Sequence, residues 1–242
     1  MLRNILFLSF LGFFTLQISA QEYKVGFRIA PHVSITRVDA KEYAYPGAKS
    51  KGTGVRMSIG PTLDYFLAEN YAFSTGLFYT IKSVNVDLGN AYKNRPDSPY
   101  IEKSRYNLQY LQIPAMLKLY TNLEVEQFRV YFQLGGTLDI KLAEKPRDNE
   151  FNYLRNLVYD NTFSNGGRKV FKPININAVL GVGGETEIGN QTVFAGLTYH
   201  HGLTKLLNNL KDENSLTGKS ETISEGIQLR TSNLFLEVGL KF

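Results

Sequence analysis

Apolar and polar residues alternate along most of this chain with a period of two. In one stretch, Phe128, Val130 and Phe132 share one face, whereas Gln133 and Asp139 share the other. A period of two is that of a β-strand, whose successive side chains point to opposite faces, and no helical period of any length is present. The alternation predicts eight strands, at roughly 23–35, 53–67, 71–86, 105–120, 127–141, 172–187, 191–205 and 227–242.

The predicted strands are long, several of them with 14 to 16 residues. A strand in a soluble protein typically has about 5 to 6 residues. A tilted strand that crosses a bilayer needs about 9 to 11 residues in the hydrocarbon alone. The lengths therefore favour strands that cross a membrane and project beyond it.

The connections between the predicted strands alternate between short and long. The short ones are Ala68-Glu69-Asn70, Thr121 to Glu126 and a turn around Gly189-Asn190; the long ones are 36–52, 87–104, 142–171 and 206–226. Outer-membrane barrels have short periplasmic turns and longer extracellular loops. The sequence thus predicts an all-β fold, an eight-stranded antiparallel up-and-down transmembrane β-barrel with four long extracellular loops.

Alternation alone does not say which face points outward. A soluble barrel turns its apolar face inward, and a membrane barrel turns it outward. Glycine is dense on the polar face, as a narrow interior requires: Gly26, Gly60, Gly76, Gly135, Gly181 and Gly183. Tyrosines near the predicted strand ends are expected to form the interfacial girdles: Tyr23, Tyr65, Tyr71, Tyr106, Tyr120 and Tyr199. Both features favour an apolar face directed at lipid.

The polar face then carries charges into the barrel interior. The cations on it are Arg28, Arg56, Lys82, Lys118 and Arg129, and the acids are Asp64, Asp139, Glu185 and Glu237. An interior enclosed by eight strands is just wide enough for side chains to fill, and buried charges must be paired because unpaired ones are costly. We therefore expect a plugged, ion-paired interior; the alternative is that these charges line a narrow conduction path.

Residues 1–20 are expected to be a cleaved signal peptide, which leaves 21–242 as one barrel domain. Arg3 precedes an apolar run from Ile5 to Leu16, and small residues precede Gln21. A membrane anchor helix is the alternative, but the run is short for a span. The chain has no cysteine, so disulfides and thiol chemistry are excluded. Its net charge of +5 comes from charges of mixed sign, with no nucleic-acid footprint.

Catalytic chemistry has few candidates in this sequence. His200 and His201 lie near the outer end of a predicted strand, and His32 is similarly placed on another. Barrel enzymes need His with Ser, Glu or Asp at the rim, and no spacing here links these histidines to such partners. Adjacent residues point to opposite faces, so one of His200 and His201 should face the interior and the other lipid or the interface. The run Gly181-Val182-Gly183-Gly184 has no following helix to make a phosphate site. We expect no catalytic, cofactor-binding or metal-binding residues and no cofactor.

Four sequence patches resemble known outer-membrane proteins. The terminal strand Leu234–Phe242 resembles the C-terminal assembly signal of outer-membrane barrels, in which alternating apolar residues lead to a terminal aromatic residue. Tyr110–Lys118 resembles the pattern YLxIPxxxK of PorT-like outer-membrane β-barrel proteins. Those barrels also have a glycine-punctuated first strand, similar to Tyr23–Arg28, and a Gly-Pro strand, similar to Gly60-Pro61. This resemblance implies a small barrel in the outer membrane of a Gram-negative cell, and PorT itself is a component of the type IX secretion system.

Three functions remain open from the sequence. The first is a non-enzymatic structural or interaction component, within a PorT-like secretion or surface assembly. The second is an outer-leaflet enzyme that modifies lipid or protein, and the third is a soluble exported ligand-binding barrel. The expected partners are outer-membrane lipid and lipopolysaccharide, the barrel-assembly machinery through the strand ending in Phe242, and protein partners at loop 142–171, which mixes aromatic residues and arginines. That loop can equally be a self-packed cap over the barrel mouth. No nucleic-acid partner is expected.

Overall fold

The structure is a computed structural model of the chain. It describes residues 22–41, 48–88, 102–121, 128–147, 169–209, 211–214, 219–222 and 226–242. The expected signal peptide, 1–20, and most of the long connections lie outside these ranges, so those expectations stay predictions. Within the described ranges, no α-helix has the length and hydropathy of a transmembrane span.

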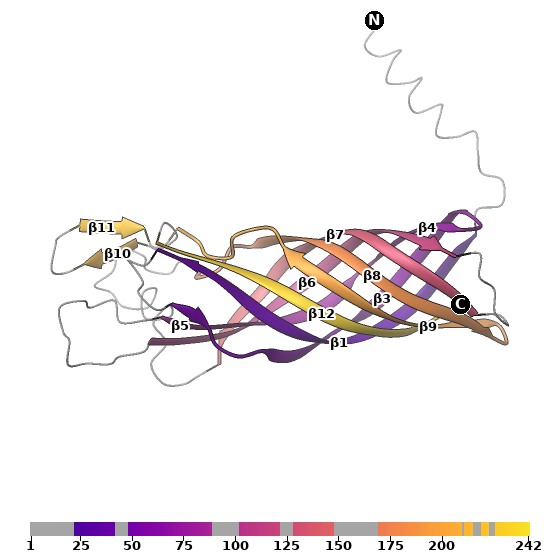
Figure 1. Ribbon diagram of the computed structural model, residues 1–242, viewed down its shortest axis with the longest axis horizontal. Coiled ribbons are helices and arrows are strands. Elements are labelled where there is room, and N and C mark those ends of the chain that lie inside the picture. The colour runs from indigo at the N-terminus through magenta and orange to yellow at the C-terminus, as the bar shows by residue number, and fades with distance from the viewer. Residues whose placement is uncertain are drawn as a thin grey trace, which may run out of the picture.

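Eight antiparallel strands form a closed ring (Figure 1). In chain order they are β1 (Tyr23–Ala40), β3 (Gly54–Ala68), β4 (Tyr71–Gly76) with β5 (Phe78–Leu88), β6 (Glu102–Tyr120), β7 (Phe128–Pro146), β8 (Ile174–Ile188), β9 (Gln191–Gly202) and β12 (Ile227–Lys241). Only Leu77 separates β4 from β5, which together make one strand of the ring. β1 pairs with both β3 and β12, and this closes the barrel. The predicted fold class is confirmed.

Three short strands were not predicted. β2 (Lys49–Ser50) pairs with the outer end of β5. β10 (Lys211–Asn214) and β11 (Lys219–Thr222) form a separate hairpin at one end of the molecule (Figure 1). β1 begins and β12 ends at the opposite end, where the turns 69–70 and 189–190 also lie (Figure 1). Short turns mark the periplasmic end of an outer-membrane barrel, so the hairpin lies at the outer end.

Strand register sets the tilt of the barrel. A path along paired residues that starts at Val25 of β1 and goes once around the ring returns to β1 at Ile35, ten residues further on. With strands about 4.8 Å apart and a rise of about 3.3 Å per residue, this shift corresponds to a tilt of about 40°. At that tilt, the outward apolar series of β1 from Tyr23 to Ile35 spans about 30 Å, the thickness of a bilayer's hydrocarbon core.

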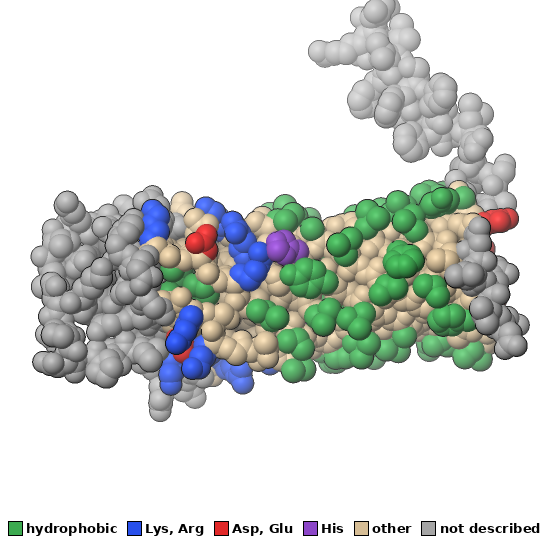
Figure 2. Space-filling view, in the orientation of Figure 1, with side chains coloured by type: hydrophobic (Ala, Val, Ile, Leu, Met, Phe, Trp, Pro, Cys, Tyr) green, Lys and Arg blue, Asp and Glu red, His purple; other side chains and the backbone are tan. Residues whose placement is uncertain are grey.

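The apolar face of the strands points outward, as predicted. On β12, the outward side chains of Leu234, Leu236, Val238 and Leu240 are 40–51% exposed, whereas Glu237 between them is 3% exposed. Similar residues on the other strands form one belt around the barrel wall, and Lys and Arg gather beyond it at the outer end (Figure 2). We call this surface the apolar belt. An exposed apolar surface of this extent needs lipid rather than water around it.

The alternation reverses its phase where the strands leave the belt. On β1 the apolar residues up to Ile35 point outward, but Val38 and Ala40 beyond it pack inward. The same reversal occurs on β6, where Leu111 and Ile113 line the outer wall and Tyr110 and Leu108 are buried inside. The inward residues at the outer end form one apolar core: Val84, Val86, Tyr106, Leu108, Tyr110, Val170, Phe171, Leu206, Leu207, Ile227 and Leu229. The barrel therefore has the side-chain pattern of a membrane barrel at the level of the belt. Toward its outer end it has the pattern of a soluble barrel, with apolar residues inside and polar residues outside.

The structure corrects two predictions, on where two strands end and on where two of the girdle tyrosines point. β1 and β7 run to Ala40 and Pro146, each five residues beyond the predicted strand end, because the expected phase of alternation stops at the belt while the strand continues. Tyr106 and Tyr120, expected in the interfacial girdles, are 2% and 6% exposed and point into the barrel. They share the inward face of β6 with Leu108 and Lys118, so they pack against other interior residues instead of lipid.

Gly60, in the Gly-Pro patch, is required by a close approach of two strands. A Cβ atom at this position would lie 2.1 Å from the carbonyl oxygen of Leu77. No side-chain rotation can relieve that contact because the obstructing atom belongs to the backbone. The patch thus reflects the packing of β3 on the junction of β4 and β5.

Candidate functional site

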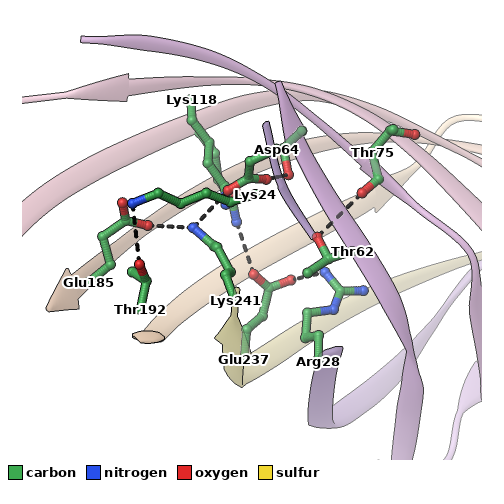
Figure 3. Close-up of polar contacts among 12 residues, drawn as sticks. Lys24, Arg28, Thr62, Asp64, Thr75, Lys118, Glu185, Thr192, Glu237 and Lys241 are labelled. Carbon is green, nitrogen blue, oxygen red and sulfur yellow. Dashed lines mark hydrogen bonds and ion pairs between the residues drawn. The ribbon is translucent and has the colours of Figure 1, made fainter. Parts of the chain in front are cut away.

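The barrel interior at the level of the belt is filled by three groups of ion-paired side chains. The group nearest the periplasmic end centres on Asp64 of β3, whose side chain is fully buried. Its Oδ2 atom accepts from Lys118 Nζ of β6 at 2.8 Å and Lys241 Nζ of β12 at 2.7 Å, and its Oδ1 accepts from Ser74 Oγ at 2.5 Å. Lys241 also pairs with Glu185 of β8 at 2.5 Å (Figure 3). This group joins strands that lie far apart in the ring.

The second group lies in mid-barrel and pairs Arg28 of β1 with Glu237 of β12. Arg28 Nη1 donates to Glu237 Oε1 at 2.5 Å (Figure 3). Glu237 Oε2 accepts from Gln133 Nε2 at 3.1 Å, and the Arg28 guanidinium stacks over the ring of Phe78 at 3.6 Å. Both oxygens of the carboxylate are thus bound, as a buried carboxylate requires.

The third group surrounds Asp139 of β7, closer to the outer end. Asp139 Oδ2 accepts from Lys82 Nζ at 2.6 Å, from Asn175 Nδ2 at 3.0 Å and from Asn177 Nδ2 at 2.7 Å. Asp139 Oδ1 accepts from Gln112 Nε2 at 2.8 Å. Four donors around one buried carboxylate compensate for the hydration that it loses.

The predicted pairing is confirmed for all four interior acids. Of the five predicted cations, Arg28, Lys82 and Lys118 pair with acids. Arg56 instead donates to the side-chain oxygen of Asn107, and Arg129 to the backbone oxygen of Glu69. Both lie near a mouth of the barrel, where water can hydrate them. Sequence reasoning left Lys241 out of the interior cations, although its place on the polar face of the last strand was the signal for it.

The space left between these groups is small. A cavity of about 20 Å³ is lined by Arg28, Thr62, Gln133, His200 and Glu237 together with neighbouring residues. A cavity needs about 10–15 Å³ of such volume to hold one water molecule. Side chains therefore fill the interior at this level, and the ion pairs act as a brace between opposite walls.

His32 and His200 point into the barrel, and both pack against the ring of Phe235. Each imidazole lies 4.2 Å from the ring centre of Phe235. Among the described residues, no hydrogen bond joins either imidazole to a nucleophile or an acid. A catalytic base needs a hydrogen-bonded nucleophile and an orienting acid. The two histidines are instead packed as flat rings against an aromatic neighbour.

His201 points outward, so the prediction that His200 and His201 face opposite ways is confirmed. Its Nε2 atom lies 3.1 Å from Arg37 Nη1, and its Nδ1 atom lies 3.3 Å from the hydroxyl of Tyr199. An arginine can only donate, so Nε2 is the acceptor and Nδ1 carries the proton. The imidazole therefore holds Arg37 in place on the outer wall.

The outer mouth is partly closed by the chain itself. Of the predicted loop 142–171, the structure describes 142–147 and 169–171. Glu144 accepts hydrogen bonds from the backbone N–H groups of Val170 at 2.8 Å and Phe171 at 3.2 Å, and pairs with Lys141 at 2.5 Å. Val170 and Phe171 are buried in the outer core. The two described ends of the loop thus pack on the barrel as a cap would; the residues between them lie outside the described ranges.

In the described part of the chain, no three His, Cys, Asp or Glu side chains are grouped so that they could hold a metal ion. The acids of the interior are engaged by lysine, arginine and amide donors.

Comparison with known proteins agrees with this architecture. Residues 19–208 match the family model described as "Outer membrane protein beta-barrel domain". The match ends before β12, the strand that closes the ring against β1. No curated protein matches the chain in sequence.

Solved structures of similar fold come from outer membranes. The chain is similar to the outer membrane protein OprG from Pseudomonas aeruginosa, with a TM-score of 0.53 and 10% identity over 90% of this chain and 96% of that one. Neisserial surface protein A has a TM-score of 0.40 and 12% identity, over 89% of this chain and 97% of that one. The outer membrane protease OmpT from Escherichia coli has a TM-score of 0.48 and 10% identity, over 93% of this chain and 99% of that one. Because the sequence identity is only 10%, the similarity to OprG shows the fold alone.

Proposed function

Since the chain belongs to the outer membrane protein β-barrel domain family and resides in the outer membrane, we propose that it acts there as a non-enzymatic structural or interaction component. The observation that carries this proposal is the braced interior. Ion pairs and stacked rings occupy the barrel at the level of the belt, which leaves the outer rim and the lipid-facing wall as the surfaces that can meet other molecules. These two surfaces can contact lipids and other proteins, whereas the filled interior does not suit the transport of solutes. A soluble ligand-binding barrel is inconsistent with the exposed apolar belt.

A PorT-like role in a type IX secretion or surface assembly is the finer form of this proposal. The resemblance at Tyr110–Lys118 supports it, but the structure also gives that pattern an architectural reason. Tyr110 is buried in the outer core, Leu111 and Ile113 lie on the outer wall, and Lys118 binds the interior acid Asp64. The pattern is therefore tied to the braced barrel, and the secretion role needs partners to be found.

Recovery of partners tests the interaction role. The barrel, tagged at the start of the mature chain so that the terminal strand stays free, would be cross-linked in cells, solubilised and purified. We expect other envelope proteins to be recovered with it. A variant in which a short Gly-Ser linker replaces 148–168, between the packed ends at Arg147 and Lys169, should lose them if the loop makes the contact. Recovery of the barrel alone after cross-linking would contradict the proposal.

An outer-leaflet enzyme is the second candidate, because His201 lies beside Tyr199 and Arg37 at the edge of the belt. Replacing His200 and His201 separately by alanine separates the two functions. If the barrel is not an enzyme, both variants should keep the wild-type surface phenotype and the wild-type outer-membrane lipid and protein profile. Loss of a lipid or protein modification in His201→Ala, with a folded barrel, would favour the enzyme instead.

A further inference from the structure

Two arginines face each other on the outer wall where the apolar belt ends. Arg37 of β1 and Arg230 of β12 are direct cross-strand partners, and both side chains are half-buried. Toward the outer end, Ile35 and Leu234 are the last exposed apolar residues of these two strands among the residues described. Like charges directly opposite each other destabilise a sheet. This pair therefore calls for a negative charge between or above the two guanidinium groups.

Neither arginine forms an ion pair with a carboxylate in the described part of the chain. The Nε atoms of both are buried and have no hydrogen-bond partner there. Asp39, the next outward residue of β1, pairs in register with Gln228 rather than with Arg230. The buried Nε atoms cannot reach a ligand, but each Nη group of Arg37 uses only one of its two hydrogens, in the contacts with His201 and Gly202. The guanidinium of Arg230 makes no hydrogen bond to a described residue, so both groups keep unused donors on their Nη atoms.

The position of Arg37 is fixed by its neighbours. It donates to His201 Nε2 at 3.1 Å and to the backbone oxygen of Gly202 at 2.5 Å, and so reaches across β12 to β9. Ser232 lies between β1 and β9 in the register and faces outward, yet it is only 4% exposed. Neighbouring outward side chains therefore cover Ser232. A donor group held in place in this way binds an anion with less loss of side-chain freedom than a free one.

The surroundings define the chemistry of the ligand. Two planar guanidinium groups present paired donors that match the oxygens of a phosphate. Exposed Ile35 is the next outward residue of β1 on the membrane side of Arg37, and exposed Leu203 follows Gly202, whose carbonyl accepts from Arg37. The ligand must therefore join a phosphate to apolar chains. The phase reversal of the strands places this site at the outer edge of the hydrocarbon core, and the site faces sideways into the bilayer.

We propose that Arg37 and Arg230 bind the phosphate of a phosphorylated glycolipid of the outer leaflet, with its acyl chains against the apolar belt. His201 is the positioning residue that holds Arg37. A dissolved phosphate is a poorer fit, because the site lies at the level of lipid headgroups and opens toward lipid rather than toward the barrel mouth. This assignment rests on the outer-membrane location and not on the interaction role proposed above.

Native mass spectrometry of the whole barrel, titrated in detergent micelles with diphosphoryl lipid A, tests the site. We expect saturable binding to the wild type and a loss of about tenfold or more in affinity for the variant R37Q/R230Q, which removes two charge-assisted contacts. The matched control is K49Q/K51Q, which removes the same charge from exposed outer-end lysines of β2 and the adjoining residue and should bind as the wild type does. Arg230→Gln alone leaves the Arg37–His201 contact in place and should also weaken binding.

Two further arms identify the source of the phosphate. Lipid A with both phosphates removed should bind the wild type as weakly as the intact lipid binds R37Q/R230Q. Inorganic phosphate at the lipid's own concentration should not displace the lipid. The proposal is overturned if the folded arginine variants bind like the wild type, if the dephosphorylated lipid binds as tightly, or if inorganic phosphate competes on equal terms.

Discussion

Replacing Asp64 by alanine is expected to destabilise the barrel by about 3 to 5 kcal/mol, the cost of breaking a buried ion pair by removing one partner. The change leaves Lys118 without its acid and Lys241 with only Glu185, and both lysines are buried in the interior. Urea unfolding of the barrel in phosphatidylcholine vesicles, followed by the heat-modifiable shift in gel mobility, measures this free energy. The chain has no tryptophan, so gel mobility is a better signal than intrinsic fluorescence.

The matched control is Glu187→Ala, which also removes one carboxylate from an ion pair with a lysine. Glu187 pairs with Lys24 at 3.0 Å, but its side chain is 63% exposed. An exposed pair contributes about 0 to 1 kcal/mol. In the double variant D64A/K118M part of the lost stability should return, because the unpaired charge is gone. If Asp64→Ala costs no more than Glu187→Ala, the interior ion pairs do not brace the barrel.

Replacing Leu236 by arginine is expected to cost about 2 to 4 kcal/mol if the residue lies at the middle of the bilayer, with smaller values nearer an interface. Leu236 is 51% exposed on the outer wall and lies opposite Leu197, which is 46% exposed. A guanidinium there must enter hydrocarbon or bend away toward a headgroup. The same vesicle unfolding experiment gives the difference in free energy.

Tyr23→Arg is the control for this prediction. Tyr23 is the first residue of β1, is 67% exposed and belongs to the periplasmic edge of the belt. Arginine at an interface costs about 0 to 1 kcal/mol. Equal costs at the two positions would mean that the wall around Leu236 does not face hydrocarbon.

The strands could be predicted because their environment is uniform within the belt. On β7, lipid on one side and charged neighbours on the other make the pattern from Phe128 to Ile140 regular, and the structure confirms it. The inward direction of Asp139 and Lys118 could be predicted from the period of two alone, because both lie on the polar face of their strands. Their specific partners did not follow, because pairing across the interior depends on the shift of ten residues around the ring, and no local pattern encodes that shift.

The outer extension was missed for a different reason. Beyond Ile35 the interior becomes apolar and the exterior polar, so Val38 and Ala40 continue β1 in the opposite phase. If the apolar residues of a strand are expected on one face throughout, the change of face after Ile35 looks like the end of the strand. The same reversal between Ile81 and Val84, and between Leu229 and Leu234, marks the membrane boundary. A search for phase reversals would have placed both the extension and the Arg37–Arg230 pair at that boundary.

The central claim, that the apolar stripe of each strand contacts lipid while the charged stripe is enclosed, can be measured on β12. Since the chain has no cysteine, single cysteines at successive positions from Leu234 to Val238 can carry spin labels without a background. In reconstituted vesicles, collisions with oxygen dissolved in the lipid should be frequent at Leu234, Leu236 and Val238 and rare at Phe235 and Glu237. High oxygen accessibility at Phe235 and Glu237 with low values at the other three, or no alternation at all, would contradict the account.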